Sequence, residues 1–165
     1  MALDLFATAA RLSDCIGESL RAPRDGCDSW EGDVCVYPGQ VPFDSCCEGG
    51  GLAWVTIESG SAVTSFPFGD NGNSAASCSL HTQAVAFEVG VLRCICTEDC
   101  DCDQIEVDAA AVYSDLQALL RGATCCFTEE DDPDWRLLGW DIIGPEGGCS
   151  GARVRLLVEQ PFPCC

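Results

Sequence analysis

Residues 83–96 read QAVAFEVGVLRCIC, which is the longest strand pattern in this 165-residue chain. Large apolar side chains alternate along it, so Val85, Phe87, Val89 and Val91 are expected to share one face of a sheet. Gly90 falls on the opposite face, and a glycine inside a strand is typical of a bulge or a close backbone approach. The stretch therefore predicts a long strand with one face in the core.

Helix patterns occur both before and after this strand in the sequence. Apolar residues at helical spacing predict an N-terminal helix over residues 4–21 and a second helix over residues 104–121. Asp4 is placed to cap the first helix, Asp103 to cap the start of the second, and Gly122 to close its end.

Shorter strand patterns, separated by glycine and proline turns, account for most of the remaining chain. They are residues 33–37, 52–57 and 62–68, and a pair at 135–143 and 151–159, followed by a short tail at 160–165. Strands that follow one another through short turns favour antiparallel pairing. We therefore expect a single α+β domain over residues 1–165, a mostly antiparallel sheet with two main helices packed on one face.

The charge of the chain excludes one class of partner. There are 27 acidic residues against eight basic ones, all arginine, for a formal net charge of −19. Because nucleic acids and anionic membranes attract proteins through Lys and Arg, we expect this surface to bind neither. No apolar run approaches a membrane span, and the start Met1-Ala2-Leu3-Asp4 is acidic where a signal peptide is basic. We expect synthesis in the cytoplasm, without secretion or membrane anchoring.

The parts needed for catalysis are scarce. His81 is the one histidine, no Gly-x-Ser-x-Gly motif is present, and a phosphate-binding loop that requires Lys cannot form. The paired carboxylates lie in turns, such as residues 129–132, where solvated charge is common. We therefore predict that the protein is not an enzyme and needs no cofactor.

Fifteen cysteines call for a separate explanation. Cys94, Cys96, Cys100 and Cys102 place four thiols within nine residues and are candidate metal ligands, although the spacing differs from that of paired zinc motifs. Disulfides fit the other positions better, and each vicinal pair is expected to bond outward because a ring between neighbours is strained. The candidate disulfide residues are Cys27, Cys35, Cys46, Cys47, Cys78, Cys125, Cys126, Cys149, Cys164 and Cys165.

Several stretches carry a resemblance to a known family. They are residues 36–47, 51–55, 87–94, the helix that ends in Cys125-Cys126, and 144–149, which together span most of residues 33–160. In this order and spacing they resemble tail-terminator-type head–tail connection proteins of long-tailed (siphovirus) actinobacteriophages. A high-GC actinobacterial genome would also explain the use of Arg without Lys.

The resemblance implies a virion structural protein that assembles in the host cytoplasm as a ring, by expectation a hexamer. Such a ring caps the tail tube protein, contacts the head-completion or stopper protein, and lets DNA pass through its lumen. No catalytic residue carries over. The cysteine run at residues 94–102 is denser than the family leads us to expect.

A ring of subunits this acidic needs apolar burial and paired arginines at its interfaces. The candidate interface residues are Arg93, Arg153, Arg155, Trp135 and Phe162. Three alternatives stay open: a neighbouring connector such as the stopper, a cysteine-rich metal-binding module built on residues 94–102, and a secreted disulfide-framework binding protein, against which the N-terminus argues.

Overall fold

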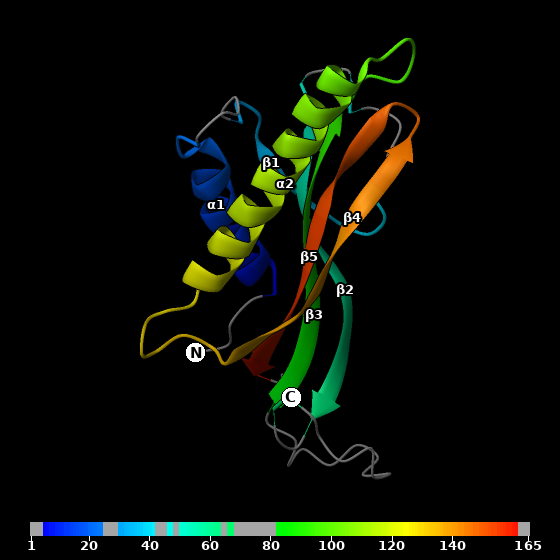
Figure 1. The fold of residues 1–165 in the computed structure, drawn as a ribbon. Coiled ribbons are helices and arrows are strands. Elements are labelled where there is room, and N and C mark those ends of the chain that lie inside the picture. The colour runs from blue at the N-terminus through cyan, green and yellow to red at the C-terminus, as the bar shows by residue number, and fades with distance from the viewer. Residues whose placement is uncertain are drawn as a thin grey trace.

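The computed structural model describes residues 5–24, 30–41, 46–47, 50–63, 66–67 and 82–161. These residues form two helices and a five-stranded sheet, the predicted α+β fold (Figure 1). In chain order the elements are α1 (Leu5–Arg21), β1 (Val34–Tyr37), β2 (Leu52–Val63), β3 (Thr82–Cys94), α2 (Cys102–Cys125), β4 (Trp135–Glu146) and β5 (Cys149–Pro161).

The strand order in the sheet is β1-β2-β3-β5-β4. β1 runs parallel to β2 and the other neighbouring pairs are antiparallel, which confirms the mostly antiparallel sheet. β3 and β5 stay in register from Thr82 opposite Pro161 to Cys94 opposite Cys149. The two edges of the sheet differ, because β1 has 4 residues and β4 has 12.

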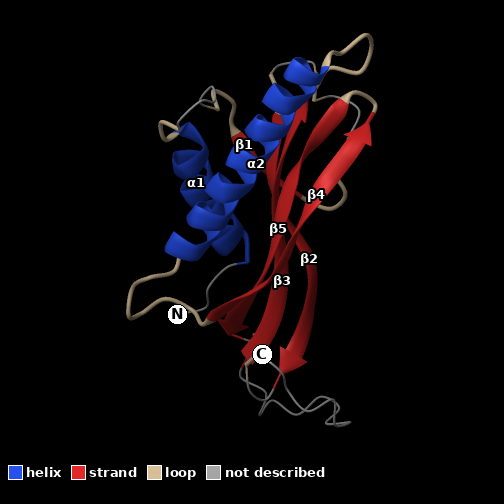
Figure 2. Ribbon diagram, viewed as in Figure 1, coloured by secondary structure: helices blue, strands red, loops and turns tan. Residues whose placement is uncertain are grey.

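Both helices pack on one face of the sheet, as predicted (Figure 2). α1 contributes Leu12, Ile16 and Leu20 to the main core, and α2 contributes Leu116 and Leu119, at the spacing that gives a helix one apolar face. The strand residues predicted to share the core face all lie in this core: Val85, Phe87, Val89 and Val91.

The opposite face of the sheet carries a smaller core around Trp54, which is fully buried beside Leu92. Gly90 makes room for this indole ring, since a Cβ atom at Gly90 would lie 2.2 Å from Cζ2 of Trp54. The close approach expected at Gly90 therefore exists, but it comes from a side chain and not from backbone.

The helix boundaries differ from the predicted ones for identifiable reasons. α2 is capped by Asp101, whose side chain accepts a hydrogen bond from the backbone N–H of Gln104 at 2.9 Å, so Asp103 lies in the first turn. The helix also continues past Gly122. A Cβ atom there would lie 3.0 Å from the carbonyl oxygen of Cys15, so this glycine permits close packing between α1 and α2. Asp4 lies outside the described residues.

Three strands, β2, β4 and β5, are longer than predicted, whereas β1 begins one residue later and β3 ends two residues earlier than predicted. Residues 52–57 and 62–63 belong to one strand, β2, with an irregular register between Ile57 and Ser59, and residues 66–67 are not in a strand. β4 and β5 extend to the two-residue turn Gly147–Gly148, where both glycines have positive φ. Residues 160–161, predicted as tail, belong to β5.

Candidate functional site

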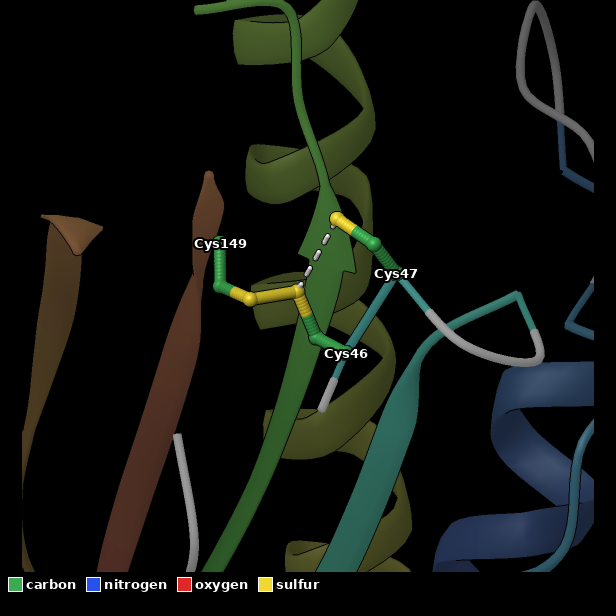
Figure 3. Close-up of side chains that lie close together, drawn as sticks. All are labelled: Cys46, Cys47 and Cys149. Carbon is green, nitrogen blue, oxygen red and sulfur yellow. Dashed lines mark hydrogen bonds between the residues drawn. A yellow bond between two sulfur atoms is a disulfide. The ribbon is translucent and has the colours of Figure 1, made fainter. Parts of the chain in front are cut away.

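A cluster of cysteines lies at the end of the sheet where β3 finishes and β5 begins. Cys46 is bonded to Cys149, and the adjacent Cys47 is bonded to Cys94. Figure 3 shows the sulfurs of Cys46 and Cys47 directed toward one another. The two atoms are 3.8 Å apart. Each member of this vicinal pair bonds outward, as the strain argument predicts, and both bonds attach the 46–47 dipeptide to the sheet.

The remaining described cysteines separate into bonded and free groups. Cys15 is bonded to Cys126 and ties α1 to the end of α2, and Cys96 is bonded to Cys100 in the loop before α2. Among the described residues the free cysteines, all exposed, are Cys35, Cys102 and Cys125. Cys27, Cys78, Cys164 and Cys165, also proposed for disulfides, lie outside the described residues.

Two predictions about cysteines need correction. Cys94, Cys96, Cys100 and Cys102 do not converge as a ligand set, because Cys94 bonds to Cys47, Cys96 bonds to Cys100 and Cys102 is exposed and free. Cys35 and Cys125, proposed as disulfide partners, are free thiols. The four cysteines that the sequence places together are divided between the end of β3 (Cys94), the following loop (Cys96 and Cys100) and the first residue of α2 (Cys102).

Arg93 belongs to a buried ion network and not to an exposed contact surface. It donates to the carboxylate of Asp115, which also accepts from Arg24 at 2.7 Å. Asp115 is fully buried, while the Arg93 and Arg24 side chains are 18% and 9% exposed. The Arg93 guanidinium also lies 5.4 Å from the ring centroid of Trp30, a cation–π contact. Arg93 therefore stabilises the domain interior.

Arg153 and Arg155 lie on the face of the sheet opposite the helices. Both donate to Asp141, and Arg153 also donates to Glu88 at 3.2 Å. Glu88 is nearly buried and also accepts from the indole N–H of Trp54. The side chains of Arg153 and Arg155 remain 37% and 41% exposed, so both are reachable by a partner surface.

A depression of about 510 Å³ lies beside these arginines and is lined by Glu58, Glu88 and Arg153 among others. The pKa of Glu58 is raised above its usual value, first because partial burial desolvates the carboxylate and second because the Glu88 charge lies nearby. Arg155 and Arg153 oppose this shift without cancelling it. The depression thus holds two carboxylates, of which Glu88 is already engaged by Trp54 and Arg153.

Replacing Glu58 with Gln is expected to increase stability at neutral pH by a small amount. Because the folded-state pKa of Glu58 is raised, its ionisation disfavours the folded protein, and wild type recovers that loss as pH falls through the folded pKa. The advantage of Glu58→Gln should therefore shrink between neutral pH and about pH 4, near the ordinary carboxyl pKa. Urea unfolding of both proteins at the two pH values measures this, and a pH-independent difference would contradict it.

An apolar trough lies between α2 and the edge strand β4. Leu137, Trp140 and Ile142 on β4 are 37%, 52% and 39% exposed, and their partners on β5 show that they share the helix side of the sheet. Ile105 and Tyr113 on α2 are 53% and 58% exposed, and a groove of about 230 Å³ separates the two elements. We call these five residues the apolar trough.

The remaining residues predicted for the interface, Trp135 and Phe162, do not belong to the trough. Trp135 is partly buried against the main core, and its indole N–H donates to the carbonyl of Phe127 at 3.1 Å. Phe162 lies outside the described residues, as does His81. Sequence reasoning did not single out the full trough, because Leu137 and Trp140 are three residues apart. They share a face only through the register irregularity between Leu137 and Gly139, which the alternation of a strand does not reveal.

No protein-family model and no curated protein matches this chain. No described helix is both long enough and apolar enough to cross a membrane.

Proposed function

We propose that this chain is a virion structural subunit of a phage head–tail junction, which forms a ring of the tail-terminator type on the tail tube. The observation that carries the proposal is the apolar trough, which runs along the edge strand β4 of 12 residues; within the part of the chain that the structure describes, the outer side of β4 pairs with no strand. A large exposed apolar surface of this kind marks an interaction site, and the occupant we propose is a second copy of this chain.

The difference between the two sheet edges supports a ring over a two-fold dimer. A ring requires two unlike surfaces on each subunit, joined head to tail. The trough along β4 supplies one surface, and the short β1 edge at the far side of the sheet supplies the other. The sequence resemblance supports the same assignment, because a small α+β ring protein is what that family would provide.

Charge sets the conditions for assembly. With a net charge of −19, neighbouring subunits repel one another unless apolar burial and arginine pairs offset the repulsion. Arg153 and Arg155 are half-exposed and are proposed to face acidic groups of the next subunit. Ring formation should therefore strengthen with added salt, which screens the net charge while leaving the apolar contact intact.

Trp140→Glu is expected to abolish the ring and leave a folded monomer. The substitution puts a charge into the middle of the apolar trough, where it would be desolvated on assembly. Val107→Glu is the matched control, because Val107 is an apolar residue of α2 that is 62% exposed but is not one of the five trough residues. Native mass spectrometry and negative-stain images of the three proteins measure the oligomeric state.

Two outcomes would count against the proposed function. Wild type could remain monomeric at every concentration and salt tested, or Trp140→Glu could assemble as well as Val107→Glu. Binding of the assembled ring to a tail tube protein, and not to a connector on the head side, separates the tail terminator from the neighbouring stopper.

A further inference from the structure

Four cysteine sulfurs meet at the end of the sheet. The sulfurs of Cys46, Cys47 and Cys149 all lie within 4.8 Å of one another, and that of Cys94 is bonded to that of Cys47. This four-cysteine node differs from the run at residues 94–102, sharing Cys94 alone with it.

The separation of the sulfurs suits a metal centre. Zinc holds thiolates at about 2.3 Å in a tetrahedron, so neighbouring sulfurs stand about 3.8 Å apart. The sulfurs of Cys46 and Cys47, which are not bonded to each other, are 3.8 Å apart. Breaking the two S–S bonds would let each bonded pair separate toward the same spacing through side-chain rotation.

Backbone pairing and core packing hold part of the node in place without the disulfides. Cys94 and Cys149 are register partners at the ends of β3 and β5, and the N–H of Ile95 donates to the carbonyl of Gly148 at 2.9 Å. Cys46 and Cys149 are 0% and 2% exposed and pack with Trp54 and Leu92 in the smaller core. A bound ion would be shielded from water on that side.

We propose that the reduced chain binds one zinc ion through the thiolates of Cys46, Cys47, Cys94 and Cys149, and that the two disulfides are the oxidised, metal-free form of the same site. Binding releases the four thiol protons as zinc–sulfur bonds form. When the zinc-bound form is oxidised, two molecules of a low-molecular-weight disulfide each accept two electrons from a pair of thiolates. Two protein disulfides form, four small-molecule thiolates are produced, and the zinc ion leaves.

This site would crosslink the end of the sheet in either redox state. In a reducing compartment, where disulfides do not persist, zinc supplies the crosslink, and after exposure to an oxidising medium the disulfides replace it. The inference does not depend on the proposed ring, because it concerns a single chain.

Alkylation of the wild-type chain tests the ligand set directly. The full chain is reduced with a phosphine, loaded with zinc chloride, treated with iodoacetamide and mapped by peptide mass spectrometry. We expect Cys46, Cys47, Cys94 and Cys149 to be protected, and to become labelled once a chelator removes the zinc. Cys35, Cys102 and Cys125 should be labelled in both samples, since they are exposed and free.

Paired substitutions provide the second test. Native mass spectrometry should find one zinc ion per reduced wild-type chain, none in Cys46→Ser/Cys149→Ser, and one in the matched control Cys96→Ser/Cys100→Ser. Cobalt in place of zinc should give the near-ultraviolet charge-transfer absorption of thiolate ligation. The proposal is overturned if zinc protects Cys96, Cys100 and Cys102 instead, or if the four node cysteines react equally with and without zinc.

Discussion

Asp115→Asn is expected to lower the free energy of unfolding by about 3–5 kcal/mol, the usual cost of removing one partner from a buried ion pair. Asp115 is fully buried and accepts hydrogen bonds from both Arg24 and Arg93. The asparagine keeps the shape of the side chain but removes the charge. Two guanidinium groups, each mostly buried, would then lack their counterion.

Asp141→Asn is the matched control for this experiment. Asp141 also accepts from two arginines, Arg153 and Arg155, but its side chain is 43% exposed and theirs are 37% and 41% exposed. Solvent screens such pairs, so the loss should stay below about 1 kcal/mol. Urea unfolding with the disulfides intact gives both values. Equal losses for the two variants would show that burial of Asp115 does not govern the network.

The elements with strong periodicity could be predicted from the sequence alone. β3 carries alternating large apolar residues, and α1 carries Leu12, Ile16 and Leu20 at helical spacing, so both elements and their core faces agree with the prediction. The fold class follows from their order. These patterns are local, and each one reports which face of an element is buried.

The sequence-based predictions that differ from the structure concern residues whose role depends on a partner distant in the sequence. Gly122 has the character of a helix end, yet it lies inside α2 because Cys15 of α1 packs against it. Arg93 has the character of a surface charge, yet it pairs with Asp115, 22 residues away and inside the domain. Such partners become neighbours through tertiary packing, which a single sequence does not display.

The cysteines show the same limit most clearly. The outward bonding of Cys46 and Cys47 follows from local geometry, but their partners are 103 and 47 residues away. Proximity in sequence favoured a metal set at residues 94–102, whereas the sheet register brings Cys94 next to Cys149. Cys15 was not among the candidates because it lies within a helix pattern, away from any loop.

Removing the crosslink between Cys15 and Cys126 is expected to have an effect as large as that of Asp115→Asn. The bond joins residues 111 apart, and in the chain-entropy model a loop of that order stabilises the folded state by somewhat under 5 kcal/mol. The disulfides from Cys46 and Cys47 already shorten the free path between the two residues, which reduces the expected loss for Cys15→Ala/Cys126→Ala to about 4 kcal/mol. The loss should fall mainly on the packing of α1 against α2, because the bond connects those helices.

The matched control is Cys96→Ala/Cys100→Ala, which removes a disulfide between residues only 4 apart. Because closing so short a loop restricts the unfolded chain little, the chain-entropy model predicts a loss of about 2 kcal/mol for this variant. That is roughly half the loss expected for the Cys15–Cys126 bond. Oxidised protein of each kind is unfolded in urea, and hydrogen exchange then locates the weakened region. Amides of α1 should lose protection in the first variant and keep it in the control. If the two variants lose equal stability, or if α1 stays protected in both, the Cys15–Cys126 bond does not hold the helix pair together.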